Sequence, residues 1–279
     1  PRASVSATRI GDVLDTDLSI TAPIDAQPSL KNEGLITFNN VSYHYPKASE
    51  NVLNNISFTA RPGETTAIIG STGSGKSTLI NLIPRFYDVT DGAIEIDGID
   101  IRKMTQADLR ANIGYVPQKG MLFSGNVVSN IAYGKDDAST DEIMKALEVA
   151  QAKNFVSEME DGIETAIAQG GGNVSGGQKQ RLSIARALVK KAPIYIFDDS
   201  FSALDFKTDA ALRSALDAYT DNTTVLIVAQ RISTIMDAEQ IIVLDKGRIV
   251  GIGIHDALMK NCETYQEIAK SQLSEEELA

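Results

Sequence analysis

Two short stretches of the sequence carry residues whose types and spacing suit phosphate and metal chemistry. The first, GSTGSGKST, contains Gly70, Gly73, Gly75, Lys76 and Ser77 in the spacing G-x-x-x-x-G-K-[ST]. Glycine permits backbone angles that are closed to other residues, so successive N–H groups can point at phosphate oxygens. The lysine adds a positive charge near the β- and γ-phosphates, and the serine hydroxyl can bind Mg²⁺. The spacing therefore predicts a nucleoside triphosphate site. The residues predicted to bind the phosphates are Ser71, Thr72, Gly73, Ser74, Gly75, Lys76, Ser77 and Thr78.

The second stretch is IYIFDDS, residues 194–200, in which an apolar run leads directly into Asp198 and Asp199. A buried strand that ends in carboxylates places them where a site can use them. Carboxylate oxygens are ligands that Mg²⁺ prefers. By themselves, the two aspartates indicate a pair of metal ligands of equal standing.

The surrounding pattern predicts the elements that must position these residues. Residues 35–45 alternate as a half-exposed strand does, and residues 55–60 follow as a second strand that should pair with the first in antiparallel fashion. A strand-like run at 65–70 precedes the glycine loop, and a helix-like segment at 76–86 follows it. The alternative interpretation is a flexible glycine loop that contains a lysine by coincidence, and such a loop would not need a strand before it and a helix after it.

Further along the chain, apolar runs of strand length alternate with helical segments. Strands are expected at 193–197, 223–229 and 240–244, and helices at 141–152 and 207–219. Alternating strands and helices predict an α/β fold with a parallel sheet covered on both faces.

Composition excludes several classes of protein. The 279 residues carry a formal net charge of −11, which argues against a nucleic-acid-binding surface. Cys262 is the single cysteine, so an intrachain disulfide is excluded. The longest unbroken apolar run is residues 225–229, far below the roughly 17–25 residues of a membrane-spanning helix.

Two further stretches point to a family. NVSGGQKQRLSIARAL, residues 173–188, places a Ser-Gly-Gly-Gln sequence ahead of a long amphipathic segment, and YIFDDSFSALD follows it closely. With the glycine loop upstream, the chain from about 35 to 271 resembles the nucleotide-binding domain of an ATP-binding cassette (ABC) transporter, of the exporter (multidrug) type. The resemblance implies a P-loop NTPase (RecA-like) parallel-sheet core, an antiparallel β subdomain and an inserted helical subdomain at about 119–190. It also implies a domain at 35–275, preceded at 1–34 by the linker and tail of a transmembrane domain.

The resemblance assigns roles to single residues, with ATP and Mg²⁺ as the bound groups. Tyr45 in SYHYP matches the aromatic residue that stacks on adenine, although a plain surface tyrosine is the alternative. Gln118 in IGYVPQ matches the glutamine that contacts Mg²⁺ and senses the γ-phosphate. Asp198 matches the carboxylate that helps to hold Mg²⁺ beside Ser77.

Two other motifs would act on the ATP of a facing subunit, in a head-to-tail pair of domains. The signature residues that match are Val174, Ser175, Gly176, Gly177 and Gln178. The residues that match the crossing loop (D-loop) are Ser202, Ala203, Leu204 and Asp205.

Two residues depart from the family pattern within one expected site. Asp199 stands where active members have a catalytic glutamate, and Gln230 in VAQRIST stands where they have a histidine. An aspartate withdraws the carboxylate by roughly 1 Å, which can cost on the order of 10²-fold in rate, and glutamine cannot carry the positive charge open to histidine. We therefore expect ATP binding with weakened hydrolysis, unless Asp199 works through a reoriented water.

The departures match one half of a heterodimeric exporter, in which the second half-transporter supplies an intact catalytic glutamate. Gln169 and Gly170, where the family usually has Glu-Arg, also match that group. The expected protein is an ATPase domain at the cytosolic face of a membrane, coupled to a transmembrane domain. The alternatives are a purely regulatory ATP-binding module and a non-transport ABC ATPase acting on DNA, although the latter would call for heptad segments or a basic surface.

Overall fold

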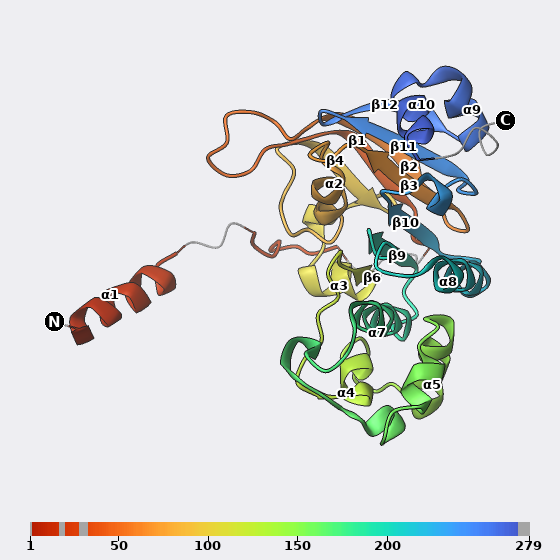
Figure 1. Cartoon of the computed structure of the whole chain (residues 1–279). Helices are drawn as coiled ribbons and strands as arrows, with labels where there is room; N and C mark the ends of the chain where they lie inside the picture. Colours follow the sequence, from red (N-terminus) through yellow and green to blue (C-terminus); the bar gives the residue numbers. More distant parts are fainter. Residues whose placement is uncertain (1, 17–19, 28–32, 273–279) are drawn as a thin grey trace.

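The computed structural model describes residues 2–16, 20–27 and 33–272, and a six-stranded sheet crosses its main body (Figure 1). The strand order is β12-β11-β3-β10-β9-β6. The strands are β3 (Thr65–Gly70), β6 (Ile113–Val116), β9 (Ile194–Asp198), β10 (Thr224–Val228), β11 (Gln240–Asp245) and β12 (Arg248–Gly253). Neighbours pair in parallel except for β12, which is antiparallel at the edge. The expected parallel-sheet core is confirmed.

The apolar runs of the central strands are explained by burial on both faces of this sheet. In β10, Val225 and Ile227 belong to the core under the helices α7 (Gly176–Leu188) and α8 (Phe206–Tyr219), whereas Leu226 and Val228 belong to the core on the opposite face. Successive side chains of a strand point to opposite faces, so a strand buried on both sides reads as continuously apolar.

A second, antiparallel sheet of four strands covers one face of the body, in the order β2-β1-β4-β5. These strands are β1 (Ile36–Tyr43), β2 (Leu53–Ala60), β4 (Asp91–Ile96) and β5 (Ile99–Asp100). Phe38 lies opposite Phe58 in the register of β1 and β2, and their rings stack with centroids 4.5 Å apart. Leu79 and Ile80 of α2 (Lys76–Leu82) share one core with both sheets. The antiparallel pairing expected from the sequence is confirmed.

Helices gather at the other end of the body, where α4 and α5 lie beyond α7 (Figure 1). The remaining helices are α3 (Gln106–Ala111), α4 (Val127–Ala132), α5 (Thr140–Val149), α6 (Lys153–Ser157), α9 (His255–Asn261) and α10 (Glu263–Lys270). The short elements are β7 (Gly125–Asn126), β8 (Ala166–Ile167), η1 (Ile101–Lys103), η2 (Gly162–Glu164), η3 (Gln169–Gly171) and η4 (Ile232–Thr234). Asn126, Ser139 and Ser175 each close a capping box, which fixes where α4, α5 and α7 begin.

Some boundaries differ from those expected. Helix α2 ends at Leu82 rather than at residue 86, because Pro84 has no backbone N–H to continue the helix and Arg85 takes a positive φ of 54°. Helix α5 ends at Val149, shortly before Gln151 takes a positive φ of 54°. Strand β12 was not expected, since its two glycines hide the strand pattern.

The N-terminal residues form helix α1 (Arg2–Leu14), which lies away from the body (Figure 1). Within 20–27 the chain touches the body, where the Gln27 N–H donates to the Lys103 carbonyl at 2.9 Å. Among the described residues, none of the helices combines the length and the apolar character needed to cross a membrane. The division of the chain near residue 34 stays a prediction.

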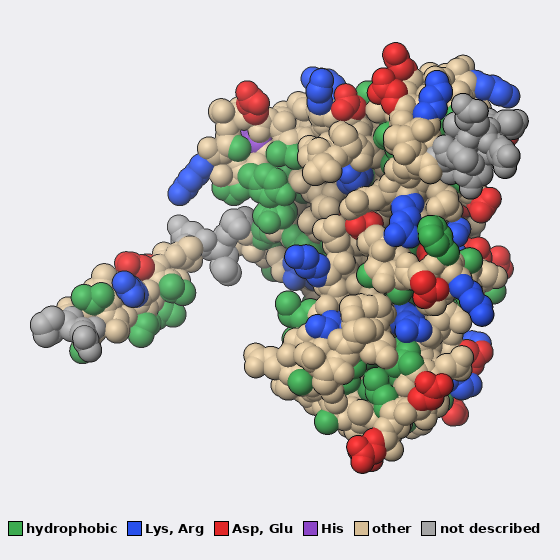
Figure 2. Space-filling view, in the orientation of Figure 1, with side chains coloured by type: hydrophobic (Ala, Val, Ile, Leu, Met, Phe, Trp, Pro, Cys, Tyr) green, Lys and Arg blue, Asp and Glu red, His purple; other side chains and the backbone are tan. Residues whose placement is uncertain are grey.

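Charged side chains of both signs are mixed over the face drawn in Figure 2. That face has no continuous basic surface, in keeping with the net charge of −11.

Candidate nucleotide-binding site

The glycine-rich loop, residues 70–75, connects the carboxyl end of β3 to α2. A Cβ on Gly70 would lie 2.1 Å from the Leu244 carbonyl oxygen, and a Cβ on Gly75, whose φ is 102°, would lie 2.8 Å from Leu53 Cδ2. Only glycine fits at these two points. The loop is thereby held against β11 and β2 with its backbone exposed to the site.

Lys76 brings a positive charge into this loop. Its Nζ donates to the carbonyl oxygens of Gly70 at 2.8 Å and Ser71 at 2.9 Å. Burial lowers the pKa of Lys76, and the nearby charges of Asp199 and Asp198 act in the opposite direction. The ammonium is therefore within electrostatic reach of both aspartates, on a flexible stem that can turn towards a phosphate.

Asp198 is the last residue of β9, and its side chain is buried. Its Oδ1 accepts a hydrogen bond from Ser77 Oγ at 3.2 Å. Burial raises the pKa of Asp198, an effect that the Ser77 hydrogen bond opposes. Hydroxyl, carboxylate and amide oxygens suit Mg²⁺, which in nucleotide sites takes few protein ligands and completes its shell with phosphates and waters. Ser77, Gln118 and Asp198 fit that pattern, and no cluster of three or more His, Cys, Asp or Glu metal ligands occurs among the described residues.

Asp199 is held differently from Asp198. It has a positive φ of 47°, and its backbone N–H donates to the Val228 carbonyl at 2.9 Å. One oxygen, Oδ2, accepts from Gln118 Nε2 at 3.1 Å and from Gln230 Nε2 at 2.7 Å. The structure thus brings together three side chains from the ends of the neighbouring strands β6, β9 and β10, in keeping with the sheet order.

These residues line one cavity of about 390 Å³. The predicted site residues that lie on its wall are Gly70, Ser71, Thr72, Gly73, Lys76, Ser77, Gln118, Asp198, Asp199 and Gln230. Three residues near the end of α10 also line it, namely Ile268, Ser271 and Gln272. Sequence reasoning missed these three, and no motif around them could have indicated their place.

Tyr45 and Thr78 lie beside the loop rather than on the wall of the cavity. The Tyr45 hydroxyl and Thr78 Oγ1 are 3.0 Å apart, and the tyrosine ring meets those of Tyr43 and Tyr87 edge-on. Tyr45 is therefore placed next to the phosphate loop, with its ring orientation fixed by two neighbours. The Ser74 side chain is buried and points into the loop, where its Oγ has no hydrogen-bond partner among the described residues.

The signature, residues 174–178, lies against the D-loop, residues 202–205, and neither segment lines the cavity. Ser175 is the N-cap of α7, and its Oγ accepts from the Gln178 N–H at 3.2 Å. A Cβ on Gly177 would lie 3.4 Å from the Ala203 carbonyl oxygen, and Asp205 caps α8 next to it. Within the described part of the chain, the wall of the cavity includes neither the residues 174–178 nor the residues 202–205.

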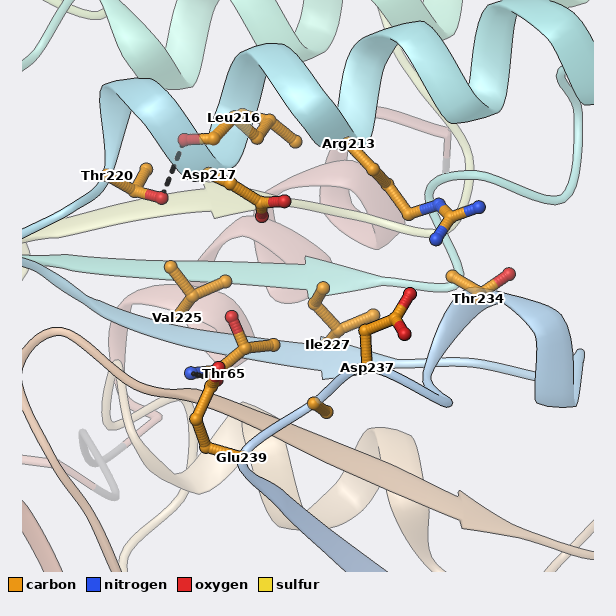
Figure 3. Close-up of a pocket in the computed structure, with 11 residues that line it drawn as sticks. Thr65, Arg213, Leu216, Asp217, Thr220, Val225, Ile227, Thr234, Asp237 and Glu239 are labelled. Atoms are coloured by element: carbon orange, nitrogen blue, oxygen red, sulfur yellow. Dashed lines mark hydrogen bonds between the residues drawn. The ribbon is translucent and has the colours of Figure 1, made fainter. Parts of the chain in front are cut away.

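A smaller cavity of about 110 Å³ lies between α8 and the strands β3 and β10 (Figure 3). Thr65 at the start of β3 lines it, so it lies at the opposite end of that strand from the glycine loop. Asp217, Asp237, Glu239 and Arg213 also line it, and Glu239 lies beside Thr65, whose N–H donates to its carboxylate at 2.8 Å (Figure 3). Burial raises the pKa of Asp217, which Arg213 opposes and the other two carboxylates reinforce. A wall with three carboxylates does not suit a phosphate.

The parallel sheet, the glycine loop between β3 and α2, and the carboxylates at the neighbouring strand end define a P-loop NTPase. The chain belongs to the ABC transporter family, whose profile, described as ABC transporter, matches residues 53–202.

Curated relatives and solved structures agree with this assignment. An uncharacterized ABC transporter ATP-binding protein of Mycobacterium tuberculosis is 49% identical over 276 residues, which are 98% of this chain and 47% of that protein. An ATP-dependent lipid A-core flippase of Haemophilus ducreyi is 43% identical over 244 residues, which are 87% of this chain and 42% of that protein. A bacterial Atm1-family ABC exporter with ATP bound superposes with a TM-score of 0.93 at 37% identity, over 98% of this chain and 48% of that chain. The chain spans about half the length of the curated relatives it matches.

Proposed function

We propose that this chain is the ATP-binding and ATP-hydrolysing domain that powers export by an ABC transporter, working at the cytosolic face of a membrane. The exporter-type relatives support the transport role, and the cavity formed by the glycine loop and the ends of the strands supports the ATP site. Ser77, Gln118 and Asp198 would hold Mg²⁺, which screens the phosphate charges when it is bound.

The observation that carries the detailed proposal is the environment of Asp199. In this proposal its carboxylate would orient the attacking water, and one of its oxygens accepts from both Gln118 and Gln230. A carboxylate that is drawn back by one methylene and bonded to two amides is poorly placed to take a proton from water. ATP is therefore held more readily than it is hydrolysed at this site.

The signature supports a role for this chain at a second site. Ser175 and the N–H groups of Gly176 and Gly177 lie outside the chain's own cavity, at the beginning of α7. In a head-to-tail pair they would meet the γ-phosphate bound by a second ABC half-transporter with an intact glutamate. A transmembrane domain would link ATP-driven closure of the pair to export.

ATP binding by a Lys76→Ala variant tests the proposal. Hydrogen bonds to charged groups contribute about 1.5–3 kcal/mol, so affinity for MgATP should fall about 10- to 100-fold when measured by titration calorimetry. Lys260→Ala, which removes an exposed lysine on α9, is the matched control and should bind as the wild type does. Equal affinity of the Lys76→Ala variant and the wild type would contradict the assigned site.

A further inference from the structure

Gln272, two residues beyond the end of α10, makes a paired contact with the loop that carries Gln230. Its Nε2 donates to the Gln230 carbonyl at 2.8 Å, and its Oε1 accepts from the Ile232 N–H at 2.9 Å. One amide side chain thus bonds to the backbone on both sides of Arg231, as a neighbouring strand would. A single side chain therefore holds both the Gln230 carbonyl and the Ile232 N–H.

The bonded segment, residues 230–232, is connected to the chemistry of the site on two sides. The Gln230 side chain donates to Asp199 at 2.7 Å. Arg231 donates to the Ser202 carbonyl at 3.3 Å and lies over the Phe206 ring at 5.4 Å. A shift of this short segment would therefore move a contact of Asp199 and a contact of the D-loop together.

Core packing fixes the position of α10, the helix that precedes Gln272. Tyr265 and Ala269 of α10 are fully buried in the core, so packing sets where that helix ends. Ile232 is the first residue of η4, and a first N–H of a helical turn lacks a partner inside the turn. Gln272 supplies that partner from outside.

We propose that Gln272 is a positioning residue of the ATP site, which holds the Gln230 loop so that its amide stays on Asp199. The inference rests on the proposed function, because it concerns the same site. It adds the C-terminal helix to the parts of the chain that determine turnover. Gln272 acts through the loop and not through the nucleotide.

Two variants separate the two hydrogen bonds. Gln272→Ala removes both, whereas Gln272→Glu keeps an acceptor for the Ile232 N–H and sets a carboxylate oxygen against the Gln230 carbonyl. The matched control is Gln266→Glu on the same helix, whose side chain makes no hydrogen bond among the described residues. Melting temperatures establish that each variant is folded.

Three measurements are made on the 279-residue chain, namely MgATP affinity, single-turnover hydrolysis and exchange of the Ile232 amide. Both Gln272 variants should hydrolyse about 10-fold faster, because a loop that is no longer held lets the Gln230 amide leave the Asp199 oxygen that must take the proton from water. Their affinity for MgATP should stay within about twofold of the wild type. The Ile232 amide should exchange about fivefold faster in Gln272→Ala alone, since one lost hydrogen bond is worth about 1 kcal/mol. Gln266→Glu should match the wild type in all three.

Two results would overturn the inference. One is hydrolysis that is unchanged or slower in both Gln272 variants, and the other is a clear loss of MgATP affinity, which would make Gln272 a nucleotide contact. Failure of the proposed function is seen separately, in a wild-type chain that does not bind MgATP. In that case the Ile232 exchange rates of the two variants still decide whether Gln272 holds the loop.

Discussion

The Asp199 carboxylate is placed by its neighbours as much as by its own length. Gln118 comes from the end of β6 and Gln230 from the end of β10, and both amides donate to the same oxygen. An amide can donate without changing charge, so neither glutamine adds the positive charge that would favour a developing anion. The three residues form a neutral clamp on an anionic side chain, which favours a stationary carboxylate over a mobile base.

Lengthening this side chain should increase hydrolysis. Asp199→Glu moves the carboxylate by roughly 1 Å towards the γ-phosphate, and a correction of that size is expected to raise single-turnover hydrolysis on the order of 10²-fold. MgATP affinity should change little, because Asp198 and Ser77 stay in place. Phosphate release measured under single-turnover conditions checks this.

Asp199→Asn serves as the matched control, since it keeps the length and removes the base. Hydrolysis below the wild-type rate in Asp199→Asn would show that Asp199 retains some catalytic work. An Asp199→Glu variant no faster than the wild type would refute the assignment of Asp199 as an undersized base.

At the scale of elements, Glu142 in the first turn of α5 connects this helix to Lys135, which precedes it, and to Lys191, which lies between α7 and β9. Glu142 accepts from Lys135 at 2.9 Å and from Lys191 at 2.8 Å, and it also closes the capping box with Ser139. These bonds, with that of Lys135 the largest, lower the pKa of Glu142 from 4.5 to about 2. A single carboxylate thereby joins the start of α5 to residues on both sides of the helical region.

The lowered pKa of Glu142 gives its contribution to stability a defined pH dependence. A carboxyl group whose folded pKa lies below its unfolded pKa stabilises the fold fully above the unfolded value and loses that effect as the pH falls towards the folded value. Glu142→Gln should therefore lower the unfolding free energy at pH 7, and the difference from the wild type should shrink between pH 4.5 and about 2. Urea unfolding at several pH values measures it. A difference that stays constant with pH would argue against these ion pairs as the cause.

The elements differ in how far the sequence could predict them. The strand, glycine loop and helix around Lys76 are local in the sequence, so spacing alone predicted the loop between β3 and α2. The meeting of Gln118, Asp199 and Gln230 depends on sheet order, which only a family resemblance could suggest. Gln272 bonds to residues 40 and 42 positions earlier through ordinary amide contacts, and such contacts leave no pattern in the sequence. Strand β12 was missed because glycines hide its strand pattern, and one of them, Gly251, is required by packing, since a Cβ there would lie 2.8 Å from the Cys262 sulfur.

At the scale of the whole molecule, the separation of the signature from the phosphate loop predicts that each complete site needs two chains. The cavity holds Lys76 and Asp199, whereas Ser175 and the D-loop lie together elsewhere on the same chain. A head-to-tail pair related by twofold symmetry would bring each signature to the other chain's cavity and close both sites at once.

Mixing two inactive variants tests this arrangement. In an Asp199→Glu background, Lys76→Ala disables the phosphate loop and Ser175→Arg disables the signature, so each variant alone should hydrolyse little ATP. In a mixed pair, one of the two sites combines the intact Lys76 of one chain with the intact Ser175 of the other. Random pairing of equal amounts should therefore restore about a quarter of the activity of the background protein, measured where ATP produces dimers. Adding Lys260→Ala to both variants should leave that fraction unchanged, and a mixture as inactive as its components would mean that Ser175 does not serve a facing chain.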